Sequence, residues 1–368
     1  MAVTAIQLCL AVLLPLRGKA LFARNDTMPN ILLTTLCNRS CPYCFAGNEM
    51  PGPANLISRE NLIYIADFLL ASGQRHISLL GGEPTLHPEC LDFILYLLDR
   101  GFNVTVFTNG ILGQCDLDEF KRHLAGVSVE RLDFVCNLNN PIQTPASAQE
   151  SEKVHTFLET MGPWTTPGFN IYRLDFSLDF LFDYIGRYGM KRRLRLGIAH
   201  PVPGSRTDFI QTGEIREVVS RLYSYRRFFD RFRVSPGLDC GFPICKFSDE
   251  ELGWLHRFPG NPFFGCGPAI DISPDMSVYH CFPLSKYHRK SLFEFDSMAR
   301  LREHFRTIRS AIQAEIAGIY DECDGCQRRE DGVCSGGGLC RIVGRFVDEA
   351  PIRLAEIEDG ISGYRISG

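Results

Sequence analysis

Three cysteines close to the start of the chain, Cys37, Cys41 and Cys44, have the spacing C-x3-C-x2-C. Three thiolates from so short a segment can bind three irons of a 4Fe-4S cube and leave one iron open to another ligand. A zinc knuckle, or thiols that are buried by coincidence, is the alternative for this spacing taken alone. We therefore predict an iron-sulfur ligand loop with chemistry at an open iron.

Two segments further along share one plan, a buried strand that ends in small or polar residues. Residues 78–85 read S-L-L-G-G-E-P-T, and residues 104–110 read V-T-V-F-T-N-G. In folds built on parallel strands, ligands bind at the carboxyl ends of the strands, so these end residues are candidates for a site. An ordinary turn after a buried strand is the alternative.

Taken in order, the three motifs resemble those of the radical SAM superfamily, whose cluster loop has this cysteine spacing and whose second strand ends in a Gly-Gly-Glu-Pro type motif. The resemblance implies that Cys37, Cys41 and Cys44 are the ligands of a catalytic 4Fe-4S cluster that also binds S-adenosyl-L-methionine. It implies further that Glu83 hydrogen-bonds the ammonium group of that cofactor. Gly81 and Gly82 would let the backbone approach the cofactor, and Pro84 would rigidify the exit of the strand.

Other strand ends supply weaker candidates for contacts to the cofactor. Polar or small residues that follow predicted strands would line the ribose and adenine, namely Thr108, Asn109, Asn137, Asn170 and the segment around Ile198. Arg173 would pair with a carboxylate of the cofactor or of the substrate. Asn and Gly are also common turn residues, which leaves a purely structural role open for each position.

Strand and helix patterns alternate from residue 30 onward, which favours a parallel sheet. Ser58 would cap a helix, and strands are predicted over residues 76–80, 103–108, 131–137, 169–173 and 193–200. We predict an α/β fold with a partial (β/α)6 TIM-type barrel over residues 30–205. A short helical segment would precede it over residues 1–29, and a small C-terminal, cysteine-rich α+β domain would follow over residues 206–368.

Eight of the fifteen cysteines lie in the C-terminal part of the chain: Cys240, Cys245, Cys266, Cys281, Cys323, Cys326, Cys334 and Cys340. A β-hairpin with Pro274 and Asp275 at its turn is predicted between Cys266 and Cys281. This arrangement resembles the SPASM and twitch extensions of radical SAM enzymes, which bind auxiliary clusters. Met276 stands where that family has a turn glycine, the final spacings are longer, and no cysteine follows Cys340.

These departures leave three interpretations of the extension. Eight cysteines suffice for two 4Fe-4S clusters, with Cys240 and Cys245 as the ligands that are missing downstream. The second interpretation is one twitch-type cluster on Cys266, Cys281, Cys323 and Cys326, and the third is a zinc site in the last four cysteines. The thiols of Cys9, Cys90, Cys115 and Cys136 are predicted to be small buried hydrophobes.

Composition fits an enzyme and excludes several other classes. With 368 residues, 45% hydrophobic and 22% charged, the chain can bury a large core, and its net charge of -4 gives no global attraction to nucleic acid or membranes. Residues 5–16 are apolar, but no positive residue precedes them and they are too short to span a bilayer. We expect a cytoplasmic protein with no nucleic-acid or membrane partner.

The expected function is that of a radical SAM oxidoreductase or maturase. It would cleave S-adenosyl-L-methionine reductively, abstract hydrogen from a peptide or a small molecule, and use one or two auxiliary clusters in electron transfer. A reductant such as flavodoxin or ferredoxin would supply the electron. The alternative is a non-catalytic iron-sulfur electron carrier or a zinc-stabilised partner protein, which would form no 5'-deoxyadenosine.

Overall fold

The computed structural model describes residues 29–46, 55–144, 146–202, 207–259, 264–267 and 269–347. The predicted N-terminal helical segment, with Cys9, therefore lies outside the described residues except for Pro29, which is the first residue of a strand. Within the described residues, the chain alternates strands and helices, as its sequence pattern indicates.

The described strands form one continuous sheet in the order β10-β9-β8-β1-β2-β3-β4-β5-β6-β7. From β1 to β7, each strand is parallel to its neighbour, and β8 is parallel to β1 on the other side. The strands are β1 Pro29–Thr34, β2 His76–Gly81, β3 Asn103–Thr108, β4 Leu132–Asn137, β5 Thr165–Ile171, β6 Arg193–Ile198, β7 Ser235–Leu238, β8 Ile270–Ile272, β9 Ser277–His280 and β10 Lys290–Ser291.

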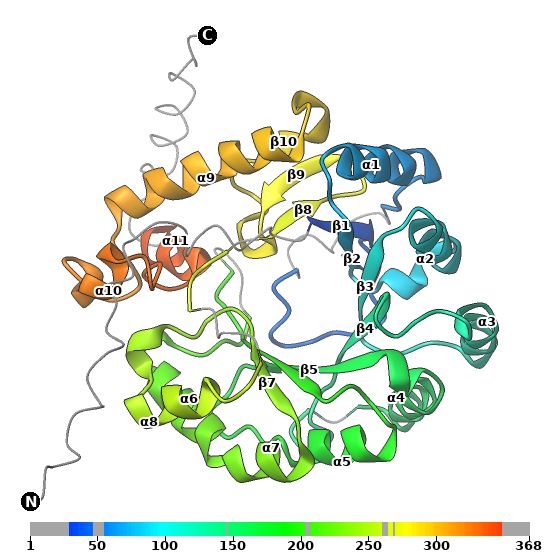
Figure 1. Cartoon of the computed structure of the whole chain (residues 1–368), viewed down its shortest axis with the longest axis horizontal. Helices are drawn as coiled ribbons and strands as arrows, with labels where there is room; N and C mark the ends of the chain where they lie inside the picture. Colours follow the sequence, from blue (N-terminus) through cyan, green and yellow to red (C-terminus); the bar gives the residue numbers. More distant parts are fainter. Residues whose placement is uncertain are drawn as a thin grey trace, which may run out of the picture.

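Figure 1 shows the strands as a ring with the helices on its outer side. The α-helices are α1 Arg59–Ala71, α2 Cys90–Asp99, α3 Gln114–Leu124, α4 Ala148–Met161, α5 Asp179–Arg187, α6 Ile215–Ser224, α7 Arg226–Phe232, α8 Asp249–Leu255, α9 Met298–Glu315, α10 Gln327–Glu330 and α11 Leu339–Val347. Short 3-10 turns are η2 Pro84–Leu86, η3 Gly162–Trp164, η4 Thr212–Glu214, η5 Ile244–Lys246, η6 Phe282–Leu284, η7 Leu292–Glu294 and η8 Asp321–Cys323. The sheet order does not join β7 to β10, so this is a partial barrel.

The local signals in the sequence explain most of these elements. Ser58 caps α1, because its hydroxyl accepts a hydrogen bond from the main-chain nitrogen of Asn61 over 3.1 Å. Helices α6 and α7 follow one another directly and meet at Tyr225. The sequence pattern also missed β7, which contains Pro236 and Gly237, two residues that disfavour strands and are tolerated at a sheet edge.

The predicted β-hairpin is present and it continues the barrel sheet. Strand β8 pairs with β1, with Pro29 opposite Ile270, so the cysteine-rich part of the chain is joined to the barrel by main-chain hydrogen bonds. Met276 in the hairpin turn has a φ of 64°, the left-handed conformation that glycine adopts without strain. Its side chain is only 2% exposed, so apolar burial offsets that strain.

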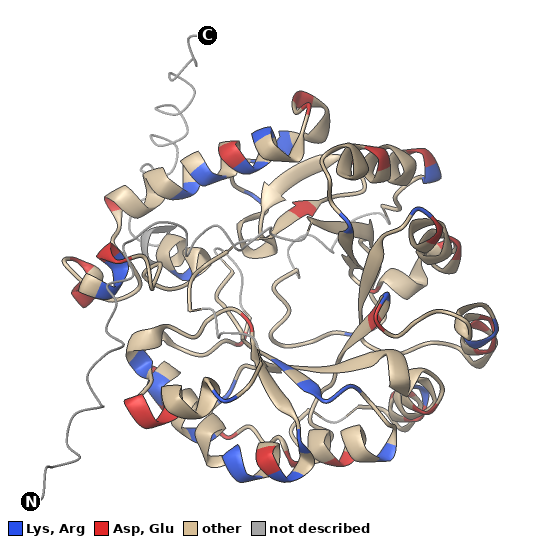
Figure 2. Ribbon diagram, in the orientation of Figure 1, with Lys and Arg blue, Asp and Glu red and all other residues tan. Residues whose placement is uncertain are grey.

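Charged residues of both signs are interspersed on the outer helices (Figure 2), and no single-sign face is evident there. Among the described helices, none combines the length and the apolar character that crossing a membrane requires. Cytoplasmic location stays a prediction, as do the domain boundaries.

Candidate functional site

The cysteine loop leaves the carboxyl end of β1 and runs into the middle of the ring of strands (Figure 1). Cys37 is exposed, and Cys41 and Cys44 are half-buried. The main-chain nitrogen of Cys44 donates a hydrogen bond to the carbonyl oxygen of Cys41 over 3.1 Å, so both thiols belong to one tight turn. Partial loss of hydration inside the ring raises the pKa of the Cys37 and Cys41 thiols, which therefore favour the protonated form until a metal replaces the proton.

The Gly-Gly-Glu-Pro segment packs directly on the start of that loop. Gly82 donates its main-chain hydrogen bond to the carbonyl oxygen of Thr34 over 2.9 Å, and Glu83 donates to that of Leu36 over 2.7 Å. A Cβ atom on Gly82 would overlap the carbonyl of Leu36 and lie 2.9 Å from Cβ of Cys37. The family resemblance implies that Gly82 lets the backbone approach a cofactor, and the structure shows in addition that Gly82 lies against the cysteine loop.

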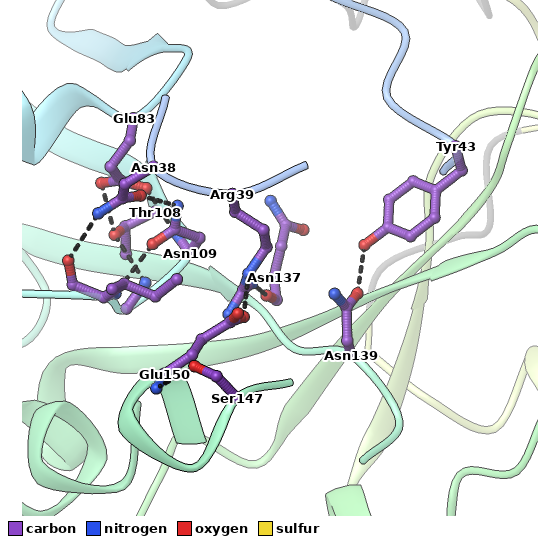
Figure 3. A network of polar contacts seen from close by, with 12 residues as sticks. Asn38, Arg39, Tyr43, Glu83, Thr108, Asn109, Asn137, Asn139, Ser147 and Glu150 are labelled. Carbon is purple, nitrogen blue, oxygen red and sulfur yellow. Dashed lines mark hydrogen bonds and ion pairs between the residues drawn. The ribbon is translucent and has the colours of Figure 1, made fainter. Parts of the chain in front are cut away.

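The carboxylate of Glu83 is the centre of a buried hydrogen-bond network (Figure 3). Its Oε1 accepts from the hydroxyls of Thr85 (2.7 Å) and Thr108 (2.8 Å) and from the main-chain nitrogen of Thr85 (3.2 Å). Its Oε2 accepts from the main-chain nitrogen of Asn109 over 2.7 Å. Burial raises the pKa of Glu83, and these hydrogen bonds act in the opposite direction.

Thr108 and Asn109, which the strand pattern makes candidates for the cofactor pocket, lie beside Glu83. Asn109 also donates its side-chain amide to Oδ1 of Asn38, a residue of the cysteine loop, over 2.7 Å. The amide of Asn38 in turn donates to the carbonyl oxygen of Ile111 over 3.0 Å. The end of β3 thus holds the cysteine loop from a second side. Pro84 is buried at the start of η2.

Arg39 anchors the cysteine loop, although no pattern in the sequence indicates this role. Its guanidinium pairs with the carboxylate of Glu150 on α4 over 2.8 Å and donates to the main-chain oxygen of Asn137 over 3.0 Å (Figure 3). The Arg39 side chain is 7% exposed, so this ion pair is shielded from water. A single arginine inside a C-x3-C-x2-C motif carries no sequence signal for a partner more than a hundred residues away.

The aromatic residue between the second and third cysteines is also fixed. The hydroxyl of Tyr43 donates to Oδ1 of Asn139 over 2.5 Å, and its ring packs on Tyr172 with 4.8 Å between ring centroids. Burial raises the pKa of Tyr43 well above its ordinary value, so the phenol stays neutral. Tyr43 therefore links the loop to the segments after β4 and β5.

The remaining predicted cofactor residues occupy different positions. Asn137 has a buried Oδ1 atom without a hydrogen-bond partner among the described residues. Ile198 is 2% exposed, and its main-chain nitrogen donates a hydrogen bond to the carbonyl oxygen of Cys240. The main chain at the end of β6 therefore contacts the cysteine-rich segment. Arg173 is engaged by a bidentate ion pair with Asp175, at 2.6 and 2.9 Å. Asn170 is half-buried on β5.

A polar pocket of about 340 Å³ opens next to the cysteine loop. It is lined by Tyr172, Arg173, Thr207, Asp208, Phe209 and Gln211. The main-chain nitrogen of Asp208, which lines the pocket, donates a hydrogen bond to the carbonyl oxygen of Pro42 over 2.9 Å. Because Pro42 is the residue after Cys41, the pocket lies beside the cysteine loop. Its guanidinium, carboxylate and amide groups suit a polar substrate.

The downstream cysteines fall into two neighbourhoods. In the first, burial and the nearby charges of Asp271, Cys340, Cys240 and Cys266 raise the pKa of Cys281. Cys266 accepts a hydrogen bond on Sγ from the main-chain nitrogen of Leu339, next to Cys340, over 3.2 Å. The first set is Cys240, Cys266, Cys281 and Cys340, which we call the hairpin set.

In the second neighbourhood, burial and the charges of Cys334 and Cys326 raise the pKa of Cys323. Burial and the charges of Cys334 and Cys323 likewise raise the pKa of Cys245. The second set is Cys245, Cys323, Cys326 and Cys334, which we call the terminal set. Each set therefore takes one ligand from the segment around η5 and the remainder from further along the chain.

No group of three or more His, Cys, Asp or Glu side chains within the described part of the chain is arranged to hold a metal ion. A cube distributes its thiolates over four irons and needs a wider arrangement than a tetrahedral zinc ion does. The last four cysteines are also divided between the two sets, since Cys340 belongs to the hairpin set.

Of the other thiols, Cys90 and Cys136 are buried as expected, but Cys115 is exposed, so its predicted burial is wrong.

Comparisons with known proteins agree with this geometry. Residues 31–164 match the family model described as the radical SAM superfamily. Molybdenum cofactor biosynthesis protein 1 of Homo sapiens is 34% identical over 330 residues, which covers 84% of this chain and 47% of that protein. The chain thus spans about half the length of this curated relative.

A second relative and a solved structure match other parts. The sporulation killing factor maturation protein SkfB of Bacillus subtilis is 36% identical over 98 residues, or 27% of this chain and 24% of that protein. The structure of native anSMEcpe with bound AdoMet has a TM-score of 0.58 at 15% identity, over 90% of this chain and 99% of that one. That likeness supports the partial-barrel fold across nearly the whole chain.

Proposed function

Since this chain belongs to the radical SAM superfamily, we propose that it cleaves S-adenosyl-L-methionine reductively and abstracts hydrogen from a peptide or a small molecule. The observation that carries the proposal is the position of the C-x3-C-x2-C loop, which lies at the carboxyl edge of the barrel strands and is held there by Gly82, Glu83 and Asn109. Ligand sites of barrel folds lie at this edge.

The residues present fit the cofactors of that chemistry. Cys37, Cys41 and Cys44 supply three thiols from one short loop, which suits a 4Fe-4S cluster with one open iron. The unpartnered Oδ1 of Asn137 suits an ammonium or hydroxyl donor, such as those of S-adenosyl-L-methionine. Oε2 of Glu83 accepts one hydrogen bond from Asn109 and keeps a lone pair for a further donor.

When bound, the cluster and S-adenosyl-L-methionine supply a 5'-deoxyadenosyl radical that removes an unactivated hydrogen atom. The chain contributes orientation and exclusion of water. Thr85, Thr108 and Asn109 hold the Glu83 carboxylate in one rotamer, and Arg39 and Tyr43 fix the cysteine loop against α4 and the segment after β5. Gly81 and Gly82 allow the end of β2 to pack on the start of the loop, because a Cβ on either would overlap the carbonyl oxygen of Thr34 or of Leu36.

The two cysteine sets fit two auxiliary 4Fe-4S clusters, one on the hairpin set and one on the terminal set. Four thiols in each set are enough for a fully ligated cube. The hairpin set is joined to the barrel, because Ile198 at the end of β6 donates its main-chain hydrogen bond to Cys240. Arg341, the residue after Cys340, donates to the carbonyl oxygen of Ile210, between the pocket residues Phe209 and Gln211, so an electron acceptor on the hairpin set would lie near the pocket. Flavodoxin or ferredoxin would deliver the priming electron.

Two substrate classes remain in the proposal, each supported by a relative. The name of SkfB describes the maturation of a killing factor, which supports a peptide, and the name of the human relative describes cofactor biosynthesis, which supports a small molecule. The polar pocket beside Pro42 accepts either a charged peptide side chain or a polar metabolite.

The test is anaerobic reconstitution with iron and sulfide, followed by reduction in the presence of S-adenosyl-L-methionine. We expect 5'-deoxyadenosine to form, and its yield to rise with either a peptide pool or a metabolite pool. The pool that raises the yield identifies the substrate class. Reconstituted clusters with no 5'-deoxyadenosine under any condition would favour the non-catalytic electron carrier instead.

A further inference from the structure

A half-buried histidine and a buried arginine form a pair between the barrel and the cysteine-rich region. His200 follows β6, and Arg341 is the residue after Cys340. Nε of Arg341 donates to Nδ1 of His200 over 3.0 Å. The other guanidinium nitrogens of Arg341 donate to the main-chain oxygens of Ile210 (2.7 Å) and Ala199 (2.9 Å), so the guanidinium is fixed in place.

This contact determines where the imidazole proton lies. A guanidinium has donors only, so Nδ1 of His200 must be an acceptor, and the ring must be neutral with its proton on Nε2. Burial, followed by the charge of Arg341, lowers the pKa of His200 to about 3, in agreement with a neutral ring. The Nε2 atom is buried, and among the described residues it has no hydrogen-bond partner. Nε2–H is therefore a buried donor that lacks an acceptor.

The free donor is close to the hairpin set. The Cε1 atom of His200, bonded to Nε2, lies 2.9 Å from the position of a Cβ on Gly241, the neighbour of Cys240. A Cβ placed on Gly338 would lie 3.6 Å from the same Cε1 atom of His200 and 3.7 Å from Sγ of Cys340. Because both residues are glycines, neither places a side chain between this edge of the ring and the neighbouring Cys240 and Cys340.

Charge gives a second, independent indication. Arg341 is 3% exposed, and its contacts within the described residues are to a neutral ring and to two carbonyl oxygens, with no carboxylate among them. A buried guanidinium without an anionic partner is costly. An anionic iron-sulfur cluster on the hairpin set would supply the missing negative charge beside Cys340.

We propose that His200, oriented by Arg341, donates a hydrogen bond from Nε2–H to a sulfur of the auxiliary cluster on the hairpin set and thereby raises its reduction potential. This inference rests on the proposed function, since it requires that cluster. Hydrogen bonds to the sulfurs of a cluster help to set its potential, because they stabilise the more negative reduced state. His200 is thus a positioning and tuning residue rather than a catalytic one.

The test is an EPR-monitored redox titration of the reconstituted full chain. His200→Leu removes the donor, and we expect one auxiliary signal to shift to a more negative potential while the other two clusters keep theirs. His200→Gln, which retains an N–H donor, should restore most of the potential. His304→Leu is the matched control, because His304 also has a buried, unpartnered Nε2 but faces Phe295 and Phe305. Equal potentials in His200→Leu and the wild type would overturn the inference.

A measurement on the unaltered protein avoids dependence on the folding of a variant. In chain labelled with 15N-histidine, pulsed EPR of the reduced cluster should show a weak histidine nitrogen coupling and an exchangeable proton. Absence of that coupling overturns the role of His200 and leaves the cluster assignment intact. Iron analysis tests the cluster assignment separately. If Cys240→Ala and Cys281→Ala cost no iron, these cysteines do not bind a cluster, and the inference about His200 fails together with the assignment.

Discussion

The main-chain nitrogen of Glu83 donates a hydrogen bond to the carbonyl oxygen of Leu36, the residue before Cys37, over 2.7 Å. This bond continues the pairing of β1 with β2 beyond the last residues of the two strands. The motif that carries Glu83 therefore supports the cysteine loop mechanically, in addition to any contact with a cofactor. Mutations that displace the main chain of the motif should consequently affect cluster binding as well as cofactor affinity.

Gly82→Ala tests this mechanical role. The added Cβ would overlap the main-chain carbonyl of Leu36, and a backbone group cannot rotate away as a side chain can. We expect the cysteine loop to be displaced, with loss of about four irons per chain and of S-adenosyl-L-methionine cleavage. Iron analysis and 5'-deoxyadenosine assays measure both effects.

The control for that change is Gly186→Ala on the exposed face of α5, where a Cβ meets no atom within 4 Å. Alanine is favoured over glycine inside a helix by up to about 1 kcal/mol, so this variant should keep its iron and gain stability. Full iron and activity in Gly82→Ala would show that the loop tolerates the overlap and that the motif does not support the cysteine loop.

Glu83→Gln separates the role of the carboxylate from that of the backbone. The variant keeps an oxygen for Thr85 and Thr108 but presents an N–H group to the main-chain nitrogen of Asn109 or to those hydroxyls. An unmade buried hydrogen bond costs about 1–3 kcal/mol, and the lost negative charge should weaken the binding of S-adenosyl-L-methionine. The cluster spectrum should be unchanged, because no iron ligand is lost.

Thr85→Val is the matched control for Glu83→Gln. It removes the hydroxyl that donates to Oε1 over 2.7 Å but leaves the carboxylate charged. We expect lower thermal stability with an affinity for S-adenosyl-L-methionine close to that of the wild type, measured by equilibrium dialysis. Equal loss of affinity in both variants would mean that Glu83 acts only through the local structure.

Replacement of Cys37, Cys41 and Cys44 together by Ala should abolish S-adenosyl-L-methionine cleavage while about eight irons remain bound. The reason is that the loop thiols and the two downstream sets are separate ligand groups. Cys115→Ala, at an exposed thiol on α3, controls for the loss of a cysteine as such. Cleavage that survives the triple change would assign the open iron elsewhere.

Much of the barrel could be predicted from local pattern. The predicted strand over residues 103–108 coincides with β3, and Ser58 caps its helix, because apolar periodicity and capping chemistry are encoded over a few residues. Strand β7 was not predicted, since Pro236 and Gly237 disfavour a strand and only pairing with β6 stabilises it.

The candidate site was predictable by residue type but not by contact. The sequence pointed to Glu83, Thr108 and Asn109, and these three do meet. It could not show that Arg39 pairs with Glu150, because nothing local relates positions so far apart in the chain. Likewise, the division of the downstream cysteines depends on how the hairpin and the terminal segment fold against β6, which spacing alone does not specify.

The buried Asp271 on β8 predicts a pH dependence of stability. Burial raises its pKa to about 7 from 3.8, although Asn30 donates a hydrogen bond to it over 2.6 Å. Because the folded pKa lies above the unfolded one, the unfolded state loses its proton first, and stability falls as pH rises between these values and is constant above them.

Asp271→Asn removes this titration and keeps an acceptor for Asn30. Between pH 6 and 8, the wild type should lose about 1 kcal/mol of stability relative to the variant, as measured by thermal or urea unfolding. Parallel stability curves for Asp271→Asn and the wild type would contradict the buried, neutral carboxyl.

The division of the downstream cysteines is tested by two pairs of substitutions. Cys240 and Cys266 belong to the hairpin set, whereas Cys245 belongs to the terminal set. We expect about twelve irons in the wild type, since each cube holds four. The double variant Cys240→Ala with Cys266→Ala damages one cluster and should retain about eight irons, and Cys240→Ala with Cys245→Ala damages both and should retain about four.

The same measurement decides among the three interpretations of this region. A wild type with about eight irons would select the single twitch-type cluster on Cys266, Cys281, Cys323 and Cys326, and loss of Cys240 and Cys245 would then cost no iron. About four irons with one zinc would establish a structural zinc site. Equal iron loss in the two double variants would show that Cys240 and Cys245 bind the same cluster. Substitution of both costs eight irons only if each is a ligand of a different cluster.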